Sequence, residues 1–431
     1  LTQLADIKKF EFRIKSNRFM NKTTAEKLDC TFLKKNDILV ARMPDPLGRA
    51  CIFPGSEVSC VTVVDVAIIR TGDNGIFPNW LMWIINSPQI HSIIEQNQTG
   101  TTRKRISRKN LSKINFLLPP LNEQKRIVSK IEELFSKIDS TKQSLEQTKL
   151  QLEQYRHSLL KSAFEGKLTE VWRKRNNLES LDETLNIIDN ECRNSKFTHD
   201  EESQLNIPDT WKTLKIARSI IFLGSGITPK GGQANYHESG IPFIRSQNVY
   251  PDGLHLENIV YVSKELHQKM SRTHTKDKDV LLNITGASIG RSCIIPENFG
   301  SANVNQHVCI LRFHEKINSL FLSYWLNSPV FQGFISFIQQ GETRQALNFE
   351  QIKNMLFPFC SLEEQEQIVS QIERGFSLIE NTQSIVNSTL QTLQTMKMSV
   401  LKQAFEGKLV PQDPNDEPAE KLLERIKKEK S

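Results

Sequence analysis

A block of about 45 residues occurs twice in this chain without a gap. The first copy begins at Glu123-Gln124 and ends at Ala163-Phe164-Glu165-Gly166-Lys167-Leu168. The second begins at Glu364-Gln365 and ends at Ala404-Phe405-Glu406-Gly407-Lys408-Leu409, so both ends keep an offset of 241 residues. A block that keeps register over this length is a duplicated structural unit. We therefore expect a pseudo-twofold internal repeat with two equivalent working surfaces.

Apolar residues recur at every seventh position through both copies, which predicts a supercoiled seam between long helices. No proline interrupts either block, while Pro119-Pro120 and Pro358 stand just before them and Gly166 and Gly407 suit the helix ends. We assign the helix seam, and the docking of partner helices, to Ile131, Ile138, Leu145, Leu152 and Leu159 in the first copy and to Ile372, Ile379, Val386, Leu393 and Val400 in the second.

The second layer of the seam is thin. Three residues after the apolar positions the chain has Leu134, Thr141, Thr148 and Tyr155 in the first copy, and Gly375, Thr382, Thr389 and Met396 in the second. Two such helices would bury little apolar surface between themselves. A hairpin that only holds the protein together is one interpretation; the other is that helices of another subunit complete the bundle.

The region before each helix also repeats, more loosely. Gly48-Arg49 corresponds to Gly290-Arg291, and Asn86-Ser87-Pro88 corresponds to Asn327-Ser328-Pro329. Short β-rich runs predict mostly antiparallel strands at 38–41, 60–69, 280–284 and 304–313, and helices are expected at 80–96 and 320–339. The predicted class is α+β, with two mixed α/β domains and two long helices. The expected divisions are 1–118 (first domain), 119–168 (helix), 169–207 (linker), 208–358 (second domain), 359–409 (helix) and 410–431 (tail helix).

The two domains are not equally complete. Leu1 falls opposite about Phe243, so the first domain has no counterpart of residues 208–242, which include Trp211 and the turn at Gly224-Ser225-Gly226. The chain also begins without methionine. We expect a truncated N-terminus. The tail should form a short amphipathic helix with Leu422, Leu423 and Ile426 on one face.

Charge and composition narrow the function. The net charge is +7, and six basic residues with no acid lie between Thr101 and Lys113. Such a run suits a polyanion such as a nucleic-acid backbone, although a solvated loop explains it equally well. No Cys-x-x-Cys pair, phosphate loop, dinucleotide turn or metal-spaced histidine pair is present, and no apolar run reaches the length of a membrane span. The scattered cysteines fit a reducing cytoplasm.

Several motifs in the right order then resemble one family across nearly the whole chain. The stretch Leu118-Pro119-Pro120-Leu121-Asn122-Glu123-Gln124 resembles the start of the spacer helix of specificity subunits in type I restriction–modification systems. Ala163-Phe164-Glu165-Gly166-Lys167-Leu168 resembles its end, the second copy and the tail from Leu409 resemble the family's C-terminal region, and Gly100-Thr101-Thr102-Arg103 resembles the end of a target-recognition domain.

The resemblance implies a DNA-recognition subunit that is not itself an enzyme. Each domain would be a target-recognition domain for one half of a split, asymmetric site in double-stranded DNA, and the helices would form an antiparallel coiled coil that sets the half-site separation. Two modification (methyltransferase) subunits would dock on the helices, with a motor and nuclease subunit as an optional further partner. No cofactor is expected on this chain, since S-adenosylmethionine and ATP would bind the partner subunits.

Base and phosphate contacts are assigned to residues that differ between the copies or carry suitable donors. For Arg49 and Arg291, which match in both copies, a structural or phosphate-binding role stays open. The candidates are Arg49, Arg103, Lys104, Arg105, Arg108 and Lys109 in the first domain and Arg245, Asn248, Arg291, Asn305, Gln306, Arg344 and Gln345 in the second. The main alternative is a coiled-coil scaffold without DNA recognition; a nuclease or methyltransferase acting alone is disfavoured by the missing motifs.

Overall fold

Two long helices dominate the secondary structure of the chain. The computed structural model describes residues 1–44, 46–72, 75–100, 104–176, 180–192, 205–339 and 346–428. Helices α5 (Leu121–Phe164) and α13 (Leu362–Phe405) have 44 residues each. The chain divides into two compact units, Leu1–Thr148 with Ile385–Ser431, and Lys149–Ser384, and each long helix contributes to both. The predicted long helices and the mixed α/β class are confirmed.

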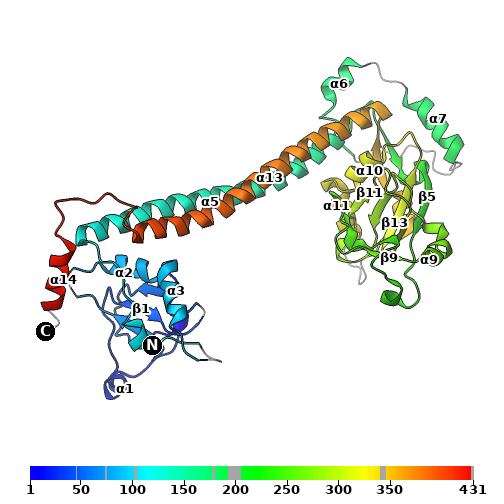
Figure 1. Ribbon diagram of the computed structural model, residues 1–431. Helices are drawn as coiled ribbons and strands as arrows, with labels where there is room; N and C mark the ends of the chain where they lie inside the picture. The colour runs from blue at the N-terminus through cyan, green and yellow to red at the C-terminus, as the bar shows by residue number, and fades with distance from the viewer. Residues whose placement is uncertain are drawn as a thin grey trace. The chain divides into compact units, whose positions relative to one another are not determined.

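The first unit combines a small sheet with short helices (Figure 1). The sheet has the order β2-β1-β3, with β1 antiparallel to both neighbours. Its elements are α1 (Lys22–Lys27), β1 (Ile38–Ala41), β2 (Ala50–Ile52), β3 (Val66–Ile69), α2 (Pro78–Ile85), α3 (Pro88–Gln96), α4 (Arg108–Leu111) and α14 (Ala419–Lys428), with a 3-10 turn at Leu4–Asp6.

The single helix predicted at 80–96 is wrong, because the chain breaks it at Asn86-Ser87. The side-chain amide of Asn86 donates to the carbonyl of Ala50 on β2 at 2.8 Å and accepts from the Ala50 N–H at 3.0 Å. Ser87 then caps α3 by accepting a hydrogen bond from the Ile90 N–H, and Pro88 occupies the first turn. The same break at Asn327-Ser328 divides the helix predicted at 320–339 into α10 and α11.

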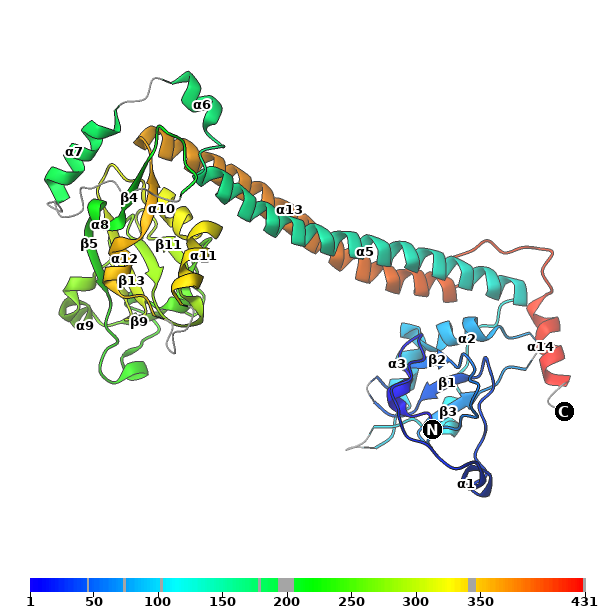
Figure 2. The ribbon, with the colours of Figure 1, turned by 180° about the vertical axis from the view of Figure 1, so that it is seen from behind.

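The second unit also combines strands with short helices (Figure 2). It contains a four-stranded sheet of order β11-β10-β13-β5 and a three-stranded sheet of order β12-β6-β9. Pairing is antiparallel except between β12 and β6. Its strands are β4 (Lys212–Lys215), β5 (Ile220–Ser225), β6 (Ile241–Ile244), β7 (Val249–Tyr250), β8 (Gly253–Leu254), β9 (Val260–Val262), β10 (Val280–Asn283), β11 (Ser292–Ile294), β12 (Asn303–Val304), β13 (Val308–Phe313) and β14 (Leu356–Phe359). Its helices are α6 (Glu170–Arg175), α7 (Leu181–Cys192), α8 (Ile216–Ser219), α9 (Lys264–Lys269), α10 (Ser319–Leu326), α11 (Pro329–Ile338) and α12 (Phe349–Asn354).

The two units repeat the same polar contacts at equivalent positions. Arg70 makes a two-pronged ion pair with the buried Asp37, and Arg312 does the same with Asp279, with N–O distances of 2.6–2.7 Å. The pairs are related by the offset of 242 residues that the loose repeat predicts. Strand β12 and the parallel bridge between Thr2 and Thr62 follow the same offset. The strand predicted at 60–69 is shorter than expected, since residues 61 and 62 form only isolated bridges and residues 64 and 65 form a turn ahead of β3.

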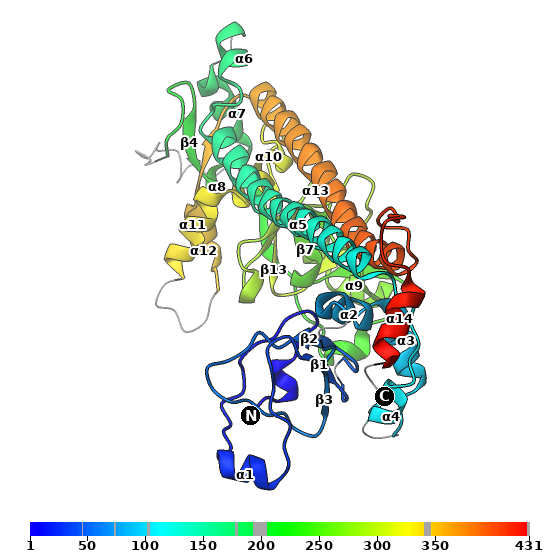
Figure 3. The same ribbon diagram turned by 90° about the vertical axis from the view of Figure 1, so that its left-hand side faces the viewer.

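The long helices pair antiparallel within each unit (Figure 3). In the first unit Lys397 lies 2.6 Å from Asp139, while Ile131 shares a core with Leu401. In the second unit Gln383 bonds Glu153 at 3.3 Å, and Leu159 lies against Gly375. All ten predicted seam residues are buried or half-buried. The predicted antiparallel coiled coil therefore fits both units.

Some side chains four residues after the apolar positions add a further layer of contacts to the seam. Arg156 lies over the ring of Phe376 at 4.4 Å in the second unit, and Lys397 lies over Phe135 at 4.8 Å in the first. Sequence analysis missed this layer because it combines cations with aromatic rings, which hydrophobic periodicity does not register. Of the predicted second-layer positions, Tyr155 and its equivalent Met396 are 47% and 46% exposed, and Thr141 is also exposed. The half-buried ones are Leu134, Thr148, Gly375, Thr382 and Thr389.

The tail forms the predicted short helix, α14. Leu422 is fully buried and Ile426 is half-buried, but Leu423 is exposed, so its placement on the apolar face is wrong. Asp416, ahead of α14, makes an ion pair of 2.8 Å with Arg126 of α5. This pair ties the tail to the start of the long helix.

Candidate nucleic-acid interface

An exposed basic segment lies at the end of the first domain. Of the residues predicted here as DNA contacts, the structure describes Lys104, Arg105, Arg108 and Lys109, and all four are exposed. A backbone bridge between Arg105 and Thr99 (2.8 and 2.9 Å) and the buried Ile106 fix the segment. Within the described ranges, none of the four side chains forms an ion pair. They present uncompensated positive charge, which suits a phosphate backbone.

The fold brings this segment next to residues 62–65, which lie just ahead of β3. The Arg42 guanidinium, which follows β1, donates to the carbonyl oxygens of Ile106 and Val64, each at 3.0 Å. The Ile106 N–H also donates to the carbonyl of Arg42 at 3.1 Å. The two segments that differ most between the copies are therefore neighbours in the folded unit, although about 40 residues separate them in sequence.

The second unit places equivalent segments together but with different chemistry. The N–H of Ile284 donates to the carbonyl of His307, and the N–H of Leu347 donates to the carbonyl of Ile284, both at 2.9 Å. The His307 ring lies 2.5 Å from the Thr285 hydroxyl and 2.9 Å from the exposed Gln306 amide. Gln306 also contacts Thr228. This cluster of neutral donors and acceptors corresponds to Met43, Val64 and Asp65 in the first unit.

Three of the candidate residues are buried in structural contacts. The Arg49 guanidinium donates to the carbonyls of Leu4 and Ile7, both at 2.7 Å, and of Pro46 at 2.9 Å. Asn248 bonds the backbone of Arg245 and His255, and Asn305 accepts from the N–H of His307. At 6%, 1% and 8% exposure respectively, these side chains favour structural roles over the DNA contacts that the sequence predicts for them.

The remaining candidates are intermediate or fall outside the described residues. The Arg245 guanidinium donates one hydrogen bond, of 2.7 Å, to the carbonyl of Asn258, so part of its donor capacity is already used within the protein. Arg291 is half-buried and lies 5.0 Å over the Tyr250 ring. Its predicted equivalence with Arg49 holds in sequence but not in contacts. Arg103, Arg344 and Gln345 lie outside the described residues.

Sequence reasoning missed Thr228, Thr285 and His307 as members of the second cluster. His307 could have been found, because it follows Gln306 directly in a turn that differs between the copies. Thr228 and Thr285 carry no such signal, since only strand pairing brings them to His307.

Possible metal ligands, cysteines and apolar helices among the described residues bear on other kinds of function. No group of three or more histidine, cysteine or acidic side chains is placed to hold a metal ion there. The seven cysteines are free, and burial raises the pKa of Cys51, Cys293 and Cys309 to about 12, so these thiols stay protonated at neutral pH. No helix of the described ranges has the length and apolar character needed to cross a membrane.

The fold and these surfaces define a class: a duplicated α/β protein with paired long helices and two dissimilar polar faces. Comparison with known proteins makes the class specific. The family model for the type I restriction modification DNA specificity domain matches residues 8–150 and 208–390. The specificity subunit of the type I restriction enzyme EcoBI from Escherichia coli is 30% identical over 359 residues, covering 80% of this chain and 70% of that protein.

Solved structures support the same fold. The HsdS subunit from Thermoanaerobacter tengcongensis superposes with a TM-score of 0.57 at 17% identity, covering 88% of this chain and 82% of that one. A structure described for complex assembly and conformational transition of the type I R-M system gives a TM-score of 0.62, also at 17% identity, covering 88% and 83%. The chain belongs to the type I restriction–modification DNA specificity family. This membership supports the role of a specificity subunit that binds DNA and assembles with other subunits of such a system.

Proposed function

We propose that each domain of this chain reads one half of an asymmetric, bipartite site in double-stranded DNA. The observation that carries the proposal is the contrast between equivalent surfaces. Arg108 and Lys109 of the first copy are exposed cations, and their equivalents in the second copy are the exposed Phe349 and Glu350. The network of hydroxyl, amide and imidazole groups at Thr285, Gln306 and His307 in the second copy has Met43, Val64 and Asp65 as its equivalents. Cations suit phosphates and guanine edges, whereas amides suit adenine edges, so unequal surfaces favour unequal half-sites.

The paired helices would set the separation of the two half-sites, near one helical turn of DNA, or about 34–36 Å between their centres. They would also dock two modification subunits, with a motor and nuclease subunit as an optional partner. Exposed apolar side chains on the two long helices are candidates for a docking surface, because a partner that covered them would remove apolar area from water. They are Leu150, Tyr155, Leu378, Ile385, Met396 and Met398.

In this proposal the chain supplies recognition and no catalysis. S-adenosylmethionine and ATP would bind the partner subunits, and the complex would act in the cytoplasm. A scaffold without DNA recognition would explain the helices, but the family match covers both globular regions and is described as a DNA specificity domain. The scaffold alternative is therefore the weaker one.

Exchange of the second domain tests the proposal. Cells that express this chain with its modification subunit should carry methylated adenine at a two-part motif. Replacing residues 208–358 with those of a relative should change one half of that motif and leave the other half and the spacing intact. The reciprocal exchange of residues 1–118 is the control and should change the opposite half. A motif that is unaltered by both exchanges, or altered in both halves by one, would contradict the assignment.

Neutralising the basic segment should weaken DNA binding and its dependence on salt. Each phosphate contact contributes about 0.9 to the slope of log affinity against log salt. We expect the double variant Arg105→Ala/Arg108→Ala to lower the slope by about 2. Fluorescence anisotropy with a labelled duplex at several salt concentrations measures it. The double variant Lys125→Ala/Lys142→Ala makes the same charge change at exposed helix positions. An equal fall in its salt slope would show that net charge alone causes the effect.

A further inference from the structure

A cavity of about 370 Å³ lies in the second unit, where the second domain meets helix α13. Its walls come from the turn between β7 and β8, from strand β11 and from helices α10 and α13. The apolar lining includes Leu254, Leu320 and Phe376, and the polar lining includes Asp252, Ser323, Tyr324, Glu373, Ser377 and Glu380. Apolar walls with a few polar groups at fixed positions are typical of a binding site.

One of these polar groups, the Tyr324 hydroxyl, has no partner. The Tyr324 side chain is 9% exposed, and it forms no hydrogen bond within the described part of the chain. Its ring makes an edge contact with the Phe376 ring, with centroids 5.5 Å apart. Burial raises the pKa of Tyr324 to about 12, helped by the charges of Glu373 and Glu380 and opposed by Arg156. The hydroxyl therefore stays neutral, lies near both carboxylates and is free to bond a ligand.

The cavity also carries more negative than positive charge. Glu373 and Glu380 are exposed on one face of α13, and neither forms an ion pair with another described residue. Glu366 is exposed seven residues before Glu373, so acidic side chains recur at heptad spacing along this face. Asp252 lies 3.2 Å from His255. A surface of this kind attracts a cation.

The first unit fills the same place with an aromatic side chain. The β7–β8 turn and its equivalent in the first unit are closed by bridges that share the offset of 242 residues. Phe10 therefore takes the place of Asp252. Its ring packs against that of Trp83, the equivalent of Tyr324, with centroids 4.2 Å apart. The common fold accommodates a plug at this position, so it does not require the open cavity of the second unit.

The charges at this place differ in the same way. In the first unit Asp139 is held by Lys397 at 2.6 Å. The equivalent residues of the second unit are Glu380 and Arg156, and Arg156 lies over the Phe376 ring at 4.4 Å without pairing to Glu380. The second unit therefore leaves a carboxylate available where the first unit neutralises one.

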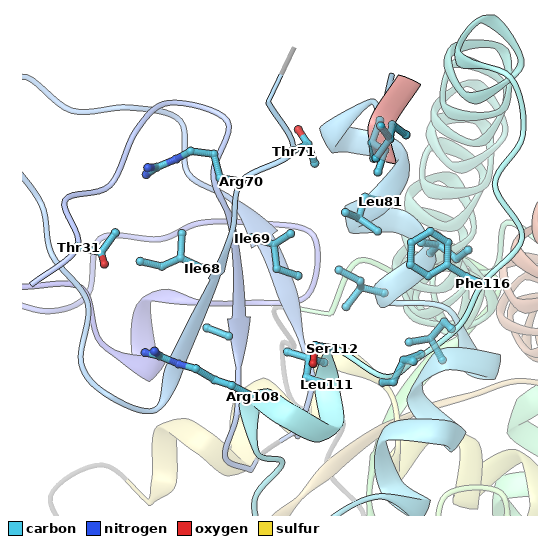
Figure 4. Close-up of a pocket in the computed structure, with 17 residues that line it drawn as sticks. Thr31, Ile68, Ile69, Arg70, Thr71, Leu81, Arg108, Leu111, Ser112 and Phe116 are labelled. Carbon is cyan, nitrogen blue, oxygen red and sulfur yellow. The ribbon is translucent and has the colours of Figure 1, made fainter. Parts of the chain in front are cut away.

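The larger cavity of the first unit is of another kind (Figure 4). It measures about 660 Å³, and Arg70 and Arg108 lie in its lining. Strand β5, within residues 208–242, covers the equivalent surface in the second unit. Because the first domain has no counterpart of these residues, that cavity is not evidence of a binding site.

We propose that the acidic cavity of the second unit receives a lysine or arginine side chain of the modification subunit, an inference that rests on the proposed docking of that subunit on the long helices. The aliphatic stem of the side chain would lie on the apolar walls, and its charged end would reach the Tyr324 hydroxyl and the carboxylates of α13. Charge complementarity identifies the occupant. Acidic side chains repel DNA phosphates, and acids at heptad spacing suit a basic helix alongside them.

Isothermal titration calorimetry of the whole chain with its modification subunit tests the inference. Glu373→Gln/Glu380→Gln should weaken binding about tenfold or more and make it less sensitive to salt. Tyr324→Phe keeps the ring and removes the hydroxyl, and should weaken binding about two- to tenfold. The matched control Glu257→Gln/Glu315→Gln removes two exposed acids that do not line the cavity, and should bind normally.

Photo-crosslinking locates the occupant. With p-benzoylphenylalanine in place of Ser377, an exposed residue of the cavity lining, irradiation of the complex should attach a segment of the modification subunit that contains lysine or arginine. Attachment only to neutral or acidic segments would overturn the inference. So would unchanged affinity of Glu373→Gln/Glu380→Gln, or an equal loss of affinity in the control.

These outcomes differ from a failure of the proposed function. If the unaltered chain binds its modification subunit and the cavity variants bind equally well, only the present inference fails. If the unaltered chain does not bind that subunit, the proposed docking fails as well. Sedimentation of the chain alone covers a further occupant: self-association that Glu373→Gln/Glu380→Gln abolishes would assign the cavity to a second copy of the chain and overturn the inference.

Discussion

Replacing Glu364 with alanine should destabilise the second unit by about 3–5 kcal/mol, the cost of breaking a buried charge pair by removing one partner. The Glu364 carboxylate is fully buried and satisfies three donors at once: the Trp211 indole, the Thr169 hydroxyl and the Arg173 guanidinium. Its loss leaves Arg173 and the indole N–H buried without their acceptor. Urea unfolding followed by Trp211 fluorescence measures the change.

The equivalent residue of the first copy provides the control. Glu123 occupies the same helix position, but its carboxylate has no such donors among the described residues, so Glu123→Ala should cost little or nothing. Burial raises the pKa of Glu123, which means that its charged form opposes folding above the ordinary carboxylate pKa. Any gain from Glu123→Ala should therefore be present at neutral pH and vanish near pH 4. Equal losses in the two variants would show that helix position, rather than the donors around Glu364, sets the energy.

Gly226→Ala should disrupt the second domain and the turn that carries Gln306 and His307 together. A Cβ atom at Gly226 would lie 1.7 Å from the carbonyl oxygen of Val304 and 2.8 Å from that of Asn305. These are backbone atoms, so the turn that carries Gln306 and His307 must move. We expect a loss of stability of at least the roughly 1–3 kcal/mol typical of overpacking, together with weakened DNA binding. Thermal unfolding and anisotropy with a labelled duplex measure the two effects.

Gly333→Ala is the matched control for this substitution. Gly333 lies in α11, and a Cβ atom there would meet no atom within 4 Å. Alanine should be neutral or stabilise the helix by up to about 1 kcal/mol. If Gly226→Ala proved as harmless as Gly333→Ala, the close approach of Gly226 to Val304 could not be what requires glycine at that position.

Repeat and periodicity predicted most of the architecture. Seven-residue spacing from Ile131 and from Ile372 predicted both long helices and their seam, because helix geometry is local and repeats along the chain. The offset between Gly48-Arg49 and Gly290-Arg291 predicted two related domains. The interruption of each domain's helix at Asn86 and Asn327 was missed, because it depends on a hydrogen bond to a strand about 35 residues away.

The candidate interface was likewise predicted from the sequence only in part. The run of cations between Lys104 and Lys109 can be recognised in the sequence alone, and Lys104, Arg105, Arg108 and Lys109 are exposed in the structure. The cluster of Thr228, Thr285 and His307 is not visible, since its members come from three separate segments.

The sequence by itself determined that this protein is a duplicated helix-and-domain unit, and its motifs were enough to indicate the specificity family. Only the tertiary structure decided what each polar residue does. Arg49 and Arg291 occupy the same Gly-Arg motif, yet Arg49 is enclosed by the carbonyls of Leu4, Ile7 and Pro46, whereas Arg291 lies over Tyr250. The physical reason is that apolar periodicity reports a local helix or strand, while the partners of a guanidinium or carboxylate come from distant segments.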